Sequence, residues 1–294
     1  MLEEVKDAVP ILHSVREAGT PYGYSYYSGW ATCGMRATLD AAAREEGGDS
    51  SSASKATAIG WMLHLLMEYY YSGQISQVGP FAVEFSQDSG VTIDDDYWNE
   101  AKRLFEAYRQ NFAPDELGEV VSVEEKIGDP EDDEEIGRIV GAEVGIYPYT
   151  CRTDLCVRIS GYRSNRLASL ALEDGLWLVD HKSAARRMDY EGDKWQYHPQ
   201  PNGYLLAYNA AARAKGEEEA KGVLMNVIYK LKTPDFRIFA VRLTDTTKPM
   251  VNYFYNQIKK RLTEEPMYRN LEACFGKYGE CLYSKLAVCD KGAL

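Results

Sequence analysis

The chain of 294 residues is long enough for one large domain or two smaller ones, and its composition, 45% hydrophobic and 27% charged, is typical of a globular enzyme. Its formal charge of −12 excludes the overall basic surface that is usual for nucleic-acid-binding proteins. It has no apolar run of about 18 residues, and its N-terminus lacks the charged and apolar regions of a secretion signal. We therefore expect a cytoplasmic protein without a membrane span.

Charge is distributed unevenly along the sequence. Residues 129–135 contain six acids in seven positions, whereas residues 151–187 contain seven Lys or Arg against four acids. The second segment predicts a locally basic surface within an acidic protein.

The first part of the chain is predicted to be mainly helical. Turn-forming residues and apolar spacing predict, in order, a tyrosine-rich loop around residues 22–27, a helix over 31–45 with Cys33 near its start, a polar linker over 45–54, and amphipathic helices over 54–71 and 95–112.

The second part is predicted to build a sheet. Apolar and β-branched runs predict strands over 120–127, 138–149, 151–161 and 176–184, a helix over 200–213, a hairpin of strands over 222–231 and 236–243, and a helix over 248–263. Helices followed by strands with an inserted helix indicate a mixed α/β domain.

The most informative segment is the end of the strand over 176–184. The apolar run Leu176–Val179 is followed by Asp180, His181 and Lys182, and alternation along a strand places Asp180 and Lys182 on one face. Burying a carboxylate and a lysine is costly, so we expect the carboxylate to hold a divalent cation and the lysine to steer water or an anionic substrate. The pattern alone is also compatible with a solvated surface pair.

A second carboxylate is predicted on a neighbouring strand. Asp154 shares a strand face with Cys156 and Arg158. Carboxylates on adjacent strands can converge on Mg²⁺ or Mn²⁺, which prefer oxygen ligands, acidify bound water and shield the charge of a phosphate. We therefore expect Asp154 and Asp180 to share a metal site.

Two helices carry further candidates. Gly60, His64 and Glu68 lie four residues apart and so share one helix face, where the imidazole either completes a metal site or packs beside the core. Gln200 and Tyr204 begin a later helix and either contact nucleic acid or, in the case of Tyr204, fill the core.

Three of the six cysteines lie close together near the C-terminus: Cys274, Cys281 and Cys289. With Cys33 as a fourth ligand they would suit an iron–sulfur cluster or zinc, and buried thiols are the alternative. Cys151 and Cys156 fall on opposite faces of a strand and are expected to be structural.

In this order, the motifs resemble those of PD-(D/E)XK nucleases of the RecB type, which include CRISPR-associated nucleases, a subunit of bacterial recombination helicases and phage exonucleases. The resemblance consists of an N-terminal Cys, G-x-x-x-H-x-x-x-E, a strand Asp, D-x-K, Q-x-x-x-Y and three C-terminal Cys, from Cys33 to Cys289. Each motif alone is weakly specific, whereas the ordered set is strongly specific.

The resemblance implies a restriction-endonuclease-like α/β fold, in which a mixed β-sheet is flanked by helices. It implies a single nuclease domain over 1–294, with a catalytic core at 55–245. The segments 20–54 and 246–294 would form a helical cap tied together by a [4Fe–4S] cluster on the four cysteines, with zinc as the less favoured occupant.

The resemblance also implies a role for each candidate residue. Asp154, Asp180 and Lys182 would be catalytic. The metal, Mg²⁺ or Mn²⁺, would be bound by His64, Asp154, Asp180 and the backbone carbonyl of His181. Lys182 would assist the attacking water, and Gln200 and Tyr204 would position DNA.

We therefore expect a metal-dependent DNA nuclease, specifically an exonuclease acting on single-stranded ends in recombination, repair or replication. It would work in the cytoplasm of a bacterium, or as a phage protein in its host, with recombination or CRISPR-type proteins as candidate partners. The alternative is a non-catalytic DNA-binding or assembly partner that keeps the nuclease fold. The acidic charge favours this alternative, whereas two buried carboxylates beside a lysine argue against it.

Overall fold

The computed structural model describes residues 22–33, 55–75, 95–161 and 165–264, together with two short strands nearer the C-terminus. The helices are α2 (Tyr24–Thr32), α4 (Lys55–Tyr71), α6 (Asp95–Asn111), α7 (Glu134–Val144), α8 (Asn165–Ala168), α9 (Glu191–Gln196), α10 (Pro199–Lys215) and α11 (Thr247–Glu264). The strands are β1 (Glu119–Ile127), β2 (Cys151–Ile159), β3 (Gly175–Ala184), β4 (Ala220–Tyr229), β5 (Asp235–Val241), β6 (Phe275–Gly276) and β7 (Gly279–Glu280).

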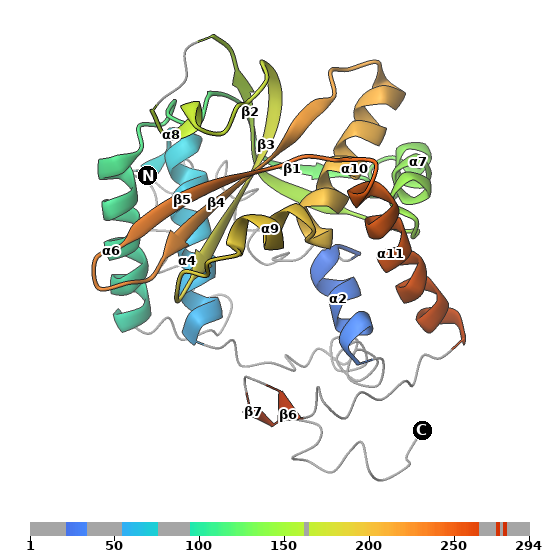
Figure 1. Cartoon of the computed structure of the whole chain (residues 1–294), viewed down its shortest axis with the longest axis horizontal. Coiled ribbons are helices and arrows are strands. Elements are labelled where there is room, and N and C mark those ends of the chain that lie inside the picture. The colour runs from blue at the N-terminus through green and yellow to red at the C-terminus, as the bar shows by residue number, and fades with distance from the viewer. Residues whose placement is uncertain are drawn as a thin grey trace, which may run out of the picture.

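A five-stranded sheet in the order β1-β2-β3-β4-β5 forms the centre of this part of the molecule (Figure 1). Its neighbours are antiparallel except for β3 and β4, which are parallel because α9 and α10 cross over between them. The result is the mixed α/β fold of restriction-endonuclease-like nucleases, as the motifs imply.

Helices cover both faces of the sheet. On one face α4 and α6 pack against a core that includes Leu155, Trp177 and Val179. On the other face α10 packs with Leu205 against Leu178, and α7 and α11 pack outside it. The apolar run of β3 is buried because it contributes to both cores, which explains why its sequence is continuous rather than alternating.

The sheet forks between β2 and β3. Their pairing runs from Ile159–Gly175 to Leu155–Val179, whereas β2 stays paired with β1 as far as Cys151 and β3 stays paired with β4 as far as Ala184. Asp154 and Asp180 are the first residues beyond the last shared pair. Two strands that separate at this point leave room between them for side chains.

Most predicted elements are confirmed: α4, α6, β1, β2, β3, α10, the β4–β5 hairpin and α11 lie within a few residues of their expected positions. The strand predicted over 138–149 is wrong. That segment is mostly α7, whose first turn is capped by the Asp133 carboxylate, which accepts from the Ile136 N–H at 3.0 Å. Val140 and Val144, one turn apart, are buried, so their β-branched character misled the prediction.

The N-terminal boundary also differs from the prediction. The tyrosine-rich segment is not a loop but helix α2, which ends at Thr32 with Cys33 as its C-cap. Most of the helix predicted over 31–45 lies outside the described residues. Tyr27 and Trp30, three residues apart, are buried and hold this helix against the α10–α11 side. The linker predicted over 45–54 lies outside the described residues.

Helix α10 approaches its neighbours closely at Gly203. A Cβ there would lie 2.6 Å from the Tyr149 hydroxyl and 2.9 Å from the Tyr255 hydroxyl, both on buried rings. Gly203→Ala should therefore lower the free energy of unfolding by about 1–3 kcal/mol, although alanine favours helices. Urea denaturation measures this. Gly192→Ala, in α9, is the control: its Cβ would meet only Phe239 at 3.6 Å, and an equal loss there would contradict the packing argument.

Candidate active site at the fork of the sheet

Asp154 lies at the fork. Its carboxylate accepts the backbone hydrogen bond that β2 would have accepted from β3 if the two strands had stayed paired. Its Oδ2 accepts from the backbone N–H of His181 at 2.5 Å and lies 3.4 Å from His64 Nδ1. Burial alone would raise the pKa of Asp154, but the charge and hydrogen bond of His64 outweigh it and hold that pKa well below its usual range. Asp154 is therefore a fixed anion between β2 and β3.

Asp180 and Lys182 face each other on β3 as predicted. Lys182 Nζ lies 2.6 Å from Asp180 Oδ2, and the Asp180 side chain is only 4% exposed. Burial raises the pKa of Asp180, although the charge of Lys182 opposes this shift. Burial would lower the pKa of Lys182, but the carboxylates of Asp180 and Asp154 outweigh burial and raise it. Lys182 thus remains a cation paired with the Asp180 carboxylate.

The side chain of His181 points to the opposite face of β3. Its ring stacks on Tyr71 with centroids 5.6 Å apart, and Asn226 Nδ2 donates to its Nδ1 at 3.0 Å. Burial lowers the pKa of His181 to about 4, so the imidazole is neutral. The side chain belongs to the core between the sheet and helices α4 and α6, which leaves only the backbone of His181 at the fork.

Helix α4 presents its four-residue motif to the same place. A Cβ on Gly60 would lie 3.5 Å from Ser183 Oγ, just past the end of the D-x-K motif, and His64 contacts Asp154. Burial would lower the pKa of His64, but the Asp154 carboxylate outweighs burial and raises it. For Glu68, burial and the charge of Asp154 act together and raise the pKa to about 7. Gly60 and His64 therefore lie on the side of α4 that is directed toward the fork.

Helix α10 brings Gln200 and Tyr204 together. Gln200 Nε2 donates to the Tyr204 hydroxyl at 3.0 Å, as expected for residues one turn apart. Burial raises the pKa of Tyr204 well above its usual value, and the nearby Asp180 carboxylate adds to this. Both side chains therefore lie toward the fork.

Glu124, near the fork, was missed by sequence reasoning. Glu124 in β1 lies opposite Asp154 in the register, because its neighbours pair with Leu155 and Thr153. It has a φ of 52°, which is rare and strained for a residue other than glycine. Its carboxylate lies 3.9 Å from Arg152, and burial, followed by Asp154 and Glu68, raises its pKa to about 8. Only the strand register reveals this placement, because the sequence around Glu124 reads as an ordinary strand.

The donor chemistry at the fork fits a divalent cation. Burial, with the charge of Asp154 adding to it, raises the pKa values of Glu68 and Glu124, and a bound cation would favour the charged forms of these carboxylates. As placed, Asp154 contacts His64 while Asp180 contacts Lys182. These are two pairs, and within the described ranges no three His, Cys, Asp or Glu side chains gather into one ligand group.

The sequence matches the family model described as the PD-(D/E)XK nuclease superfamily over residues 24–281. The chain belongs to this superfamily. Its structure also resembles a crystal structure of a protein from Eubacterium rectale described as a putative exonuclease, with a TM-score of 0.52 and 14% sequence identity, over 95% of this chain and 90% of that one. At this identity the likeness supports the fold alone. None of the functionally curated proteins matches the chain.

The cysteines and the absence of a membrane span are the remaining expectations for this PD-(D/E)XK nuclease. Cys33 is buried, whereas Cys274, Cys281 and Cys289 lie outside the described residues. Cys151 and Cys156 are buried thiols in separate parts of the core, as expected. Among the helices that the structure describes, none is long and apolar enough to cross a membrane.

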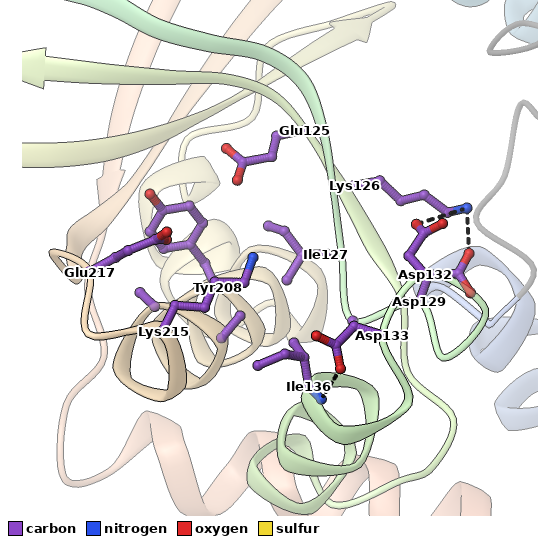
Figure 2. A pocket seen from close by; sticks show the side chains of 13 residues that line it. Glu125, Lys126, Ile127, Asp129, Asp132, Asp133, Ile136, Tyr208, Lys215 and Glu217 are labelled. Atoms are coloured by element: carbon purple, nitrogen blue, oxygen red, sulfur yellow. Dashed lines mark hydrogen bonds and ion pairs between the residues drawn. The ribbon is translucent and has the colours of Figure 1, made fainter.

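A separate cavity of about 80 Å³ lies between the end of β1, the start of α7 and the C-terminal part of α10 (Figure 2). Three of its carboxylates are engaged: Lys126 pairs with Asp129 and Asp132, and Asp133 caps α7. None of the fork residues lines it. This cavity is therefore separate from the candidate site at the fork.

His198 caps α10 beside the fork and has a distinct pH dependence. Its Nδ1 accepts a hydrogen bond from the Gln200 N–H at 3.3 Å, which requires a neutral ring. Burial, followed by the charges of Lys194 and Lys182, lowers the pKa of His198 to about 4. Unfolded histidine binds a proton near pH 6.5, so the unfolded state holds more protons between about pH 4 and 6.5. The stability contributed by His198 is complete above this window and is lost as the pH falls through it.

His198→Asn keeps a capping acceptor and removes this titration. We expect the unfolding free energy of the wild type in EDTA to fall more steeply from pH 7 to pH 4.5 than that of the variant, as measured by urea denaturation. Parallel curves for the two proteins would contradict the assignment.

Proposed function

We propose that this nuclease hydrolyses phosphodiester bonds of DNA with Mg²⁺ or Mn²⁺, and that it is an exonuclease acting on single-stranded ends. The observation that carries the proposal is the pair of largely buried carboxylates, Asp154 and Asp180, at a fork of the sheet, with Lys182 paired to Asp180. Membership of the PD-(D/E)XK nuclease superfamily supports this class of reaction.

The metal would be held by Asp154, Asp180, His64 and the backbone carbonyl of His181. When bound, it supplies a more acidic water and shields the negative charge of the scissile phosphate. The two carboxylates orient it from separate strands, and the His181 N–H fixes the Asp154 carboxylate in place.

Lys182 acts as a cation and not as a base. The carboxylates of Asp180 and Asp154 raise its pKa, so it keeps its proton at neutral pH. An ammonium group beside the phosphate orients the attacking water and stabilises the negative charge that develops in the transition state. Gln200 and Tyr204, on the first turns of α10, hold the DNA strand by hydrogen bonding.

The four cysteines form the second part of the proposal. Cys33 at the end of α2, with Cys274, Cys281 and Cys289, would hold a [4Fe–4S] cluster that joins the segments 20–54 and 246–294 into a cap on a single domain of 1–294. An anaerobic preparation should then be brown and absorb near roughly 400 nm, with iron and sulfide in equal amounts. A colourless protein that contains zinc would instead indicate that the four cysteines form a structural zinc site.

The biological setting is proposed on the resemblance alone. Single-stranded ends arise in recombination, repair and replication, and recombination or CRISPR-type proteins are the partners that a nuclease of this kind would meet. The cytoplasm of a bacterium, including one infected by a phage, is the proposed location.

Cleavage of end-labelled single-stranded and double-stranded DNA tests the proposed activity. We expect the wild type to release label with Mg²⁺ or Mn²⁺ but not with EDTA. Asp180→Asn removes a metal-binding charge and should lower kcat by roughly a thousandfold or more. Lys182→Met should lower kcat by roughly a hundredfold, with a smaller effect on KM.

Asp189→Asn is the matched control, because Asp189 is an exposed acid outside the fork. It should cleave like the wild type. Full activity of Asp180→Asn would refute the site. A folded wild type that binds DNA without cleaving it under either metal would instead favour the non-catalytic partner, which the charge of −12 also favours.

A further inference from the structure

A row of aromatic side chains borders the fork. Tyr24 at the start of α2 lies 5.2 Å from the ring of His198 and 6.4 Å from that of Phe254, between ring centroids, and His198 lies 5.3 Å from Trp195. These rings come from three segments that are far apart in the sequence: α2, α9 with the adjoining N-cap of α10, and α11 (Figure 1). Tyr24, His198 and Phe254 are half-buried, so each ring presents part of its surface outward.

Helix α2 is anchored so that Tyr24 is held in place. The Tyr27 hydroxyl donates to the Pro148 carbonyl, and the backbone N–H of Thr150 donates to the carbonyl of Tyr22 at 3.2 Å. At the other end of the helix, Arg261 Nη1 donates to the carbonyl of Ala31 at 2.5 Å. The helix is thereby tied both to the segment that leads into β2 and to α11, which fixes Tyr24 relative to the fork.

The row lies beside the start of α10, where His198 accepts from the Gln200 N–H. It is also close enough to Lys182 for its charge to act on both rings: burial raises the pKa of Tyr24 and Lys182 opposes this, while burial, then Lys194 and Lys182, lower the pKa of His198. His198 also caps the helix that carries Gln200. A strand whose phosphate lies at Lys182 would therefore have its adjoining nucleotide beside these two rings.

Both rings have hydrogen-bonding capacity to spare. Within the described part of the chain, no hydrogen bond is made by the Tyr24 hydroxyl. His198 Nδ1 accepts from Gln200, so the neutral imidazole carries its proton on Nε2 and can donate from there. A half-exposed phenol and a half-exposed imidazole with a free donor are suited to a nucleotide, which offers both a flat base and phosphate oxygens.

We propose that Tyr24 and His198 form the surface on which the nucleotide next to the scissile phosphate rests, with its base packed against the rings. The inference depends on the proposed nuclease function and names the part of the substrate that this surface recognises. A base inside a duplex is stacked on its neighbours and cannot offer its face, whereas an unpaired base can. The surface therefore selects single-stranded or frayed ends with little dependence on sequence.

Binding and cleavage by Tyr24→Ala and Tyr24→Phe test this inference. In EDTA, Tyr24→Ala should bind a fluorescent single-stranded oligonucleotide about tenfold more weakly than the wild type, which corresponds to the loss of one base–aromatic contact, and its affinity for blunt duplex should be unchanged. With Mn²⁺, KM for single strands should rise by a similar factor, while kcat changes little. Tyr24→Phe keeps the ring and should retain most of the preference.

Tyr253→Ala is the matched control, because Tyr253 is a 66% exposed tyrosine of α11 next to Phe254. It should bind like the wild type. Thermal unfolding of each variant monitors the packing of α2. The inference is overturned if Tyr24→Ala binds single strands normally, or if it loses single-strand and duplex affinity equally. Failure of the wild type to cleave DNA would instead refute the proposed function, so the two failures are distinguishable.

Discussion

The hydrogen bond from the His181 N–H to the Asp154 carboxylate is the interaction on which the site depends. At this point β2 and β3 stop pairing, and a side chain of one strand satisfies a backbone group of the other. A backbone N–H left unpaired in the interior would cost a few kcal/mol. The fork is stable because Asp154 satisfies this group, and the same bond fixes the carboxylate opposite Asp180. Sheet geometry and candidate metal chemistry are thus set by one contact.

The surrounding elements can be understood from the charge at the fork. Two largely buried carboxylates would be unstable alone, and each has a partner that favours its charged form, His64 for Asp154 and Lys182 for Asp180. Burial, with Asp154 adding to it, raises the pKa values of Glu68 and Glu124 in the same region. Burying acidic groups costs stability, and a site that binds a divalent cation is a physical reason for keeping them.

The sequence predicts those parts of the site that depend on local periodicity. Alternation places Asp180 and Lys182 on one face of β3, and helical spacing places Gly60, His64 and Glu68 on one face of α4. It fails where tertiary contacts decide. Helix α7 contains β-branched residues that favour strands, but an Asp133 cap and burial of one face make it helical. Glu124 reaches the fork through strand register and an unusual φ, and Tyr24 through the packing of a short helix; neither is visible from residue spacing.

The central claim is that the fork holds a divalent cation between Asp154 and Asp180, and direct measurement of Mn²⁺ binding tests it most simply. Electron paramagnetic resonance titration of free Mn²⁺ should reveal a saturable site in the wild type. This site should be lost in the Asp154→Asn/Asp180→Asn double variant and retained in Asp189→Asn, with all three proteins folded. Equal binding by the double variant and the wild type would contradict the account, because the cation would then be held by other residues.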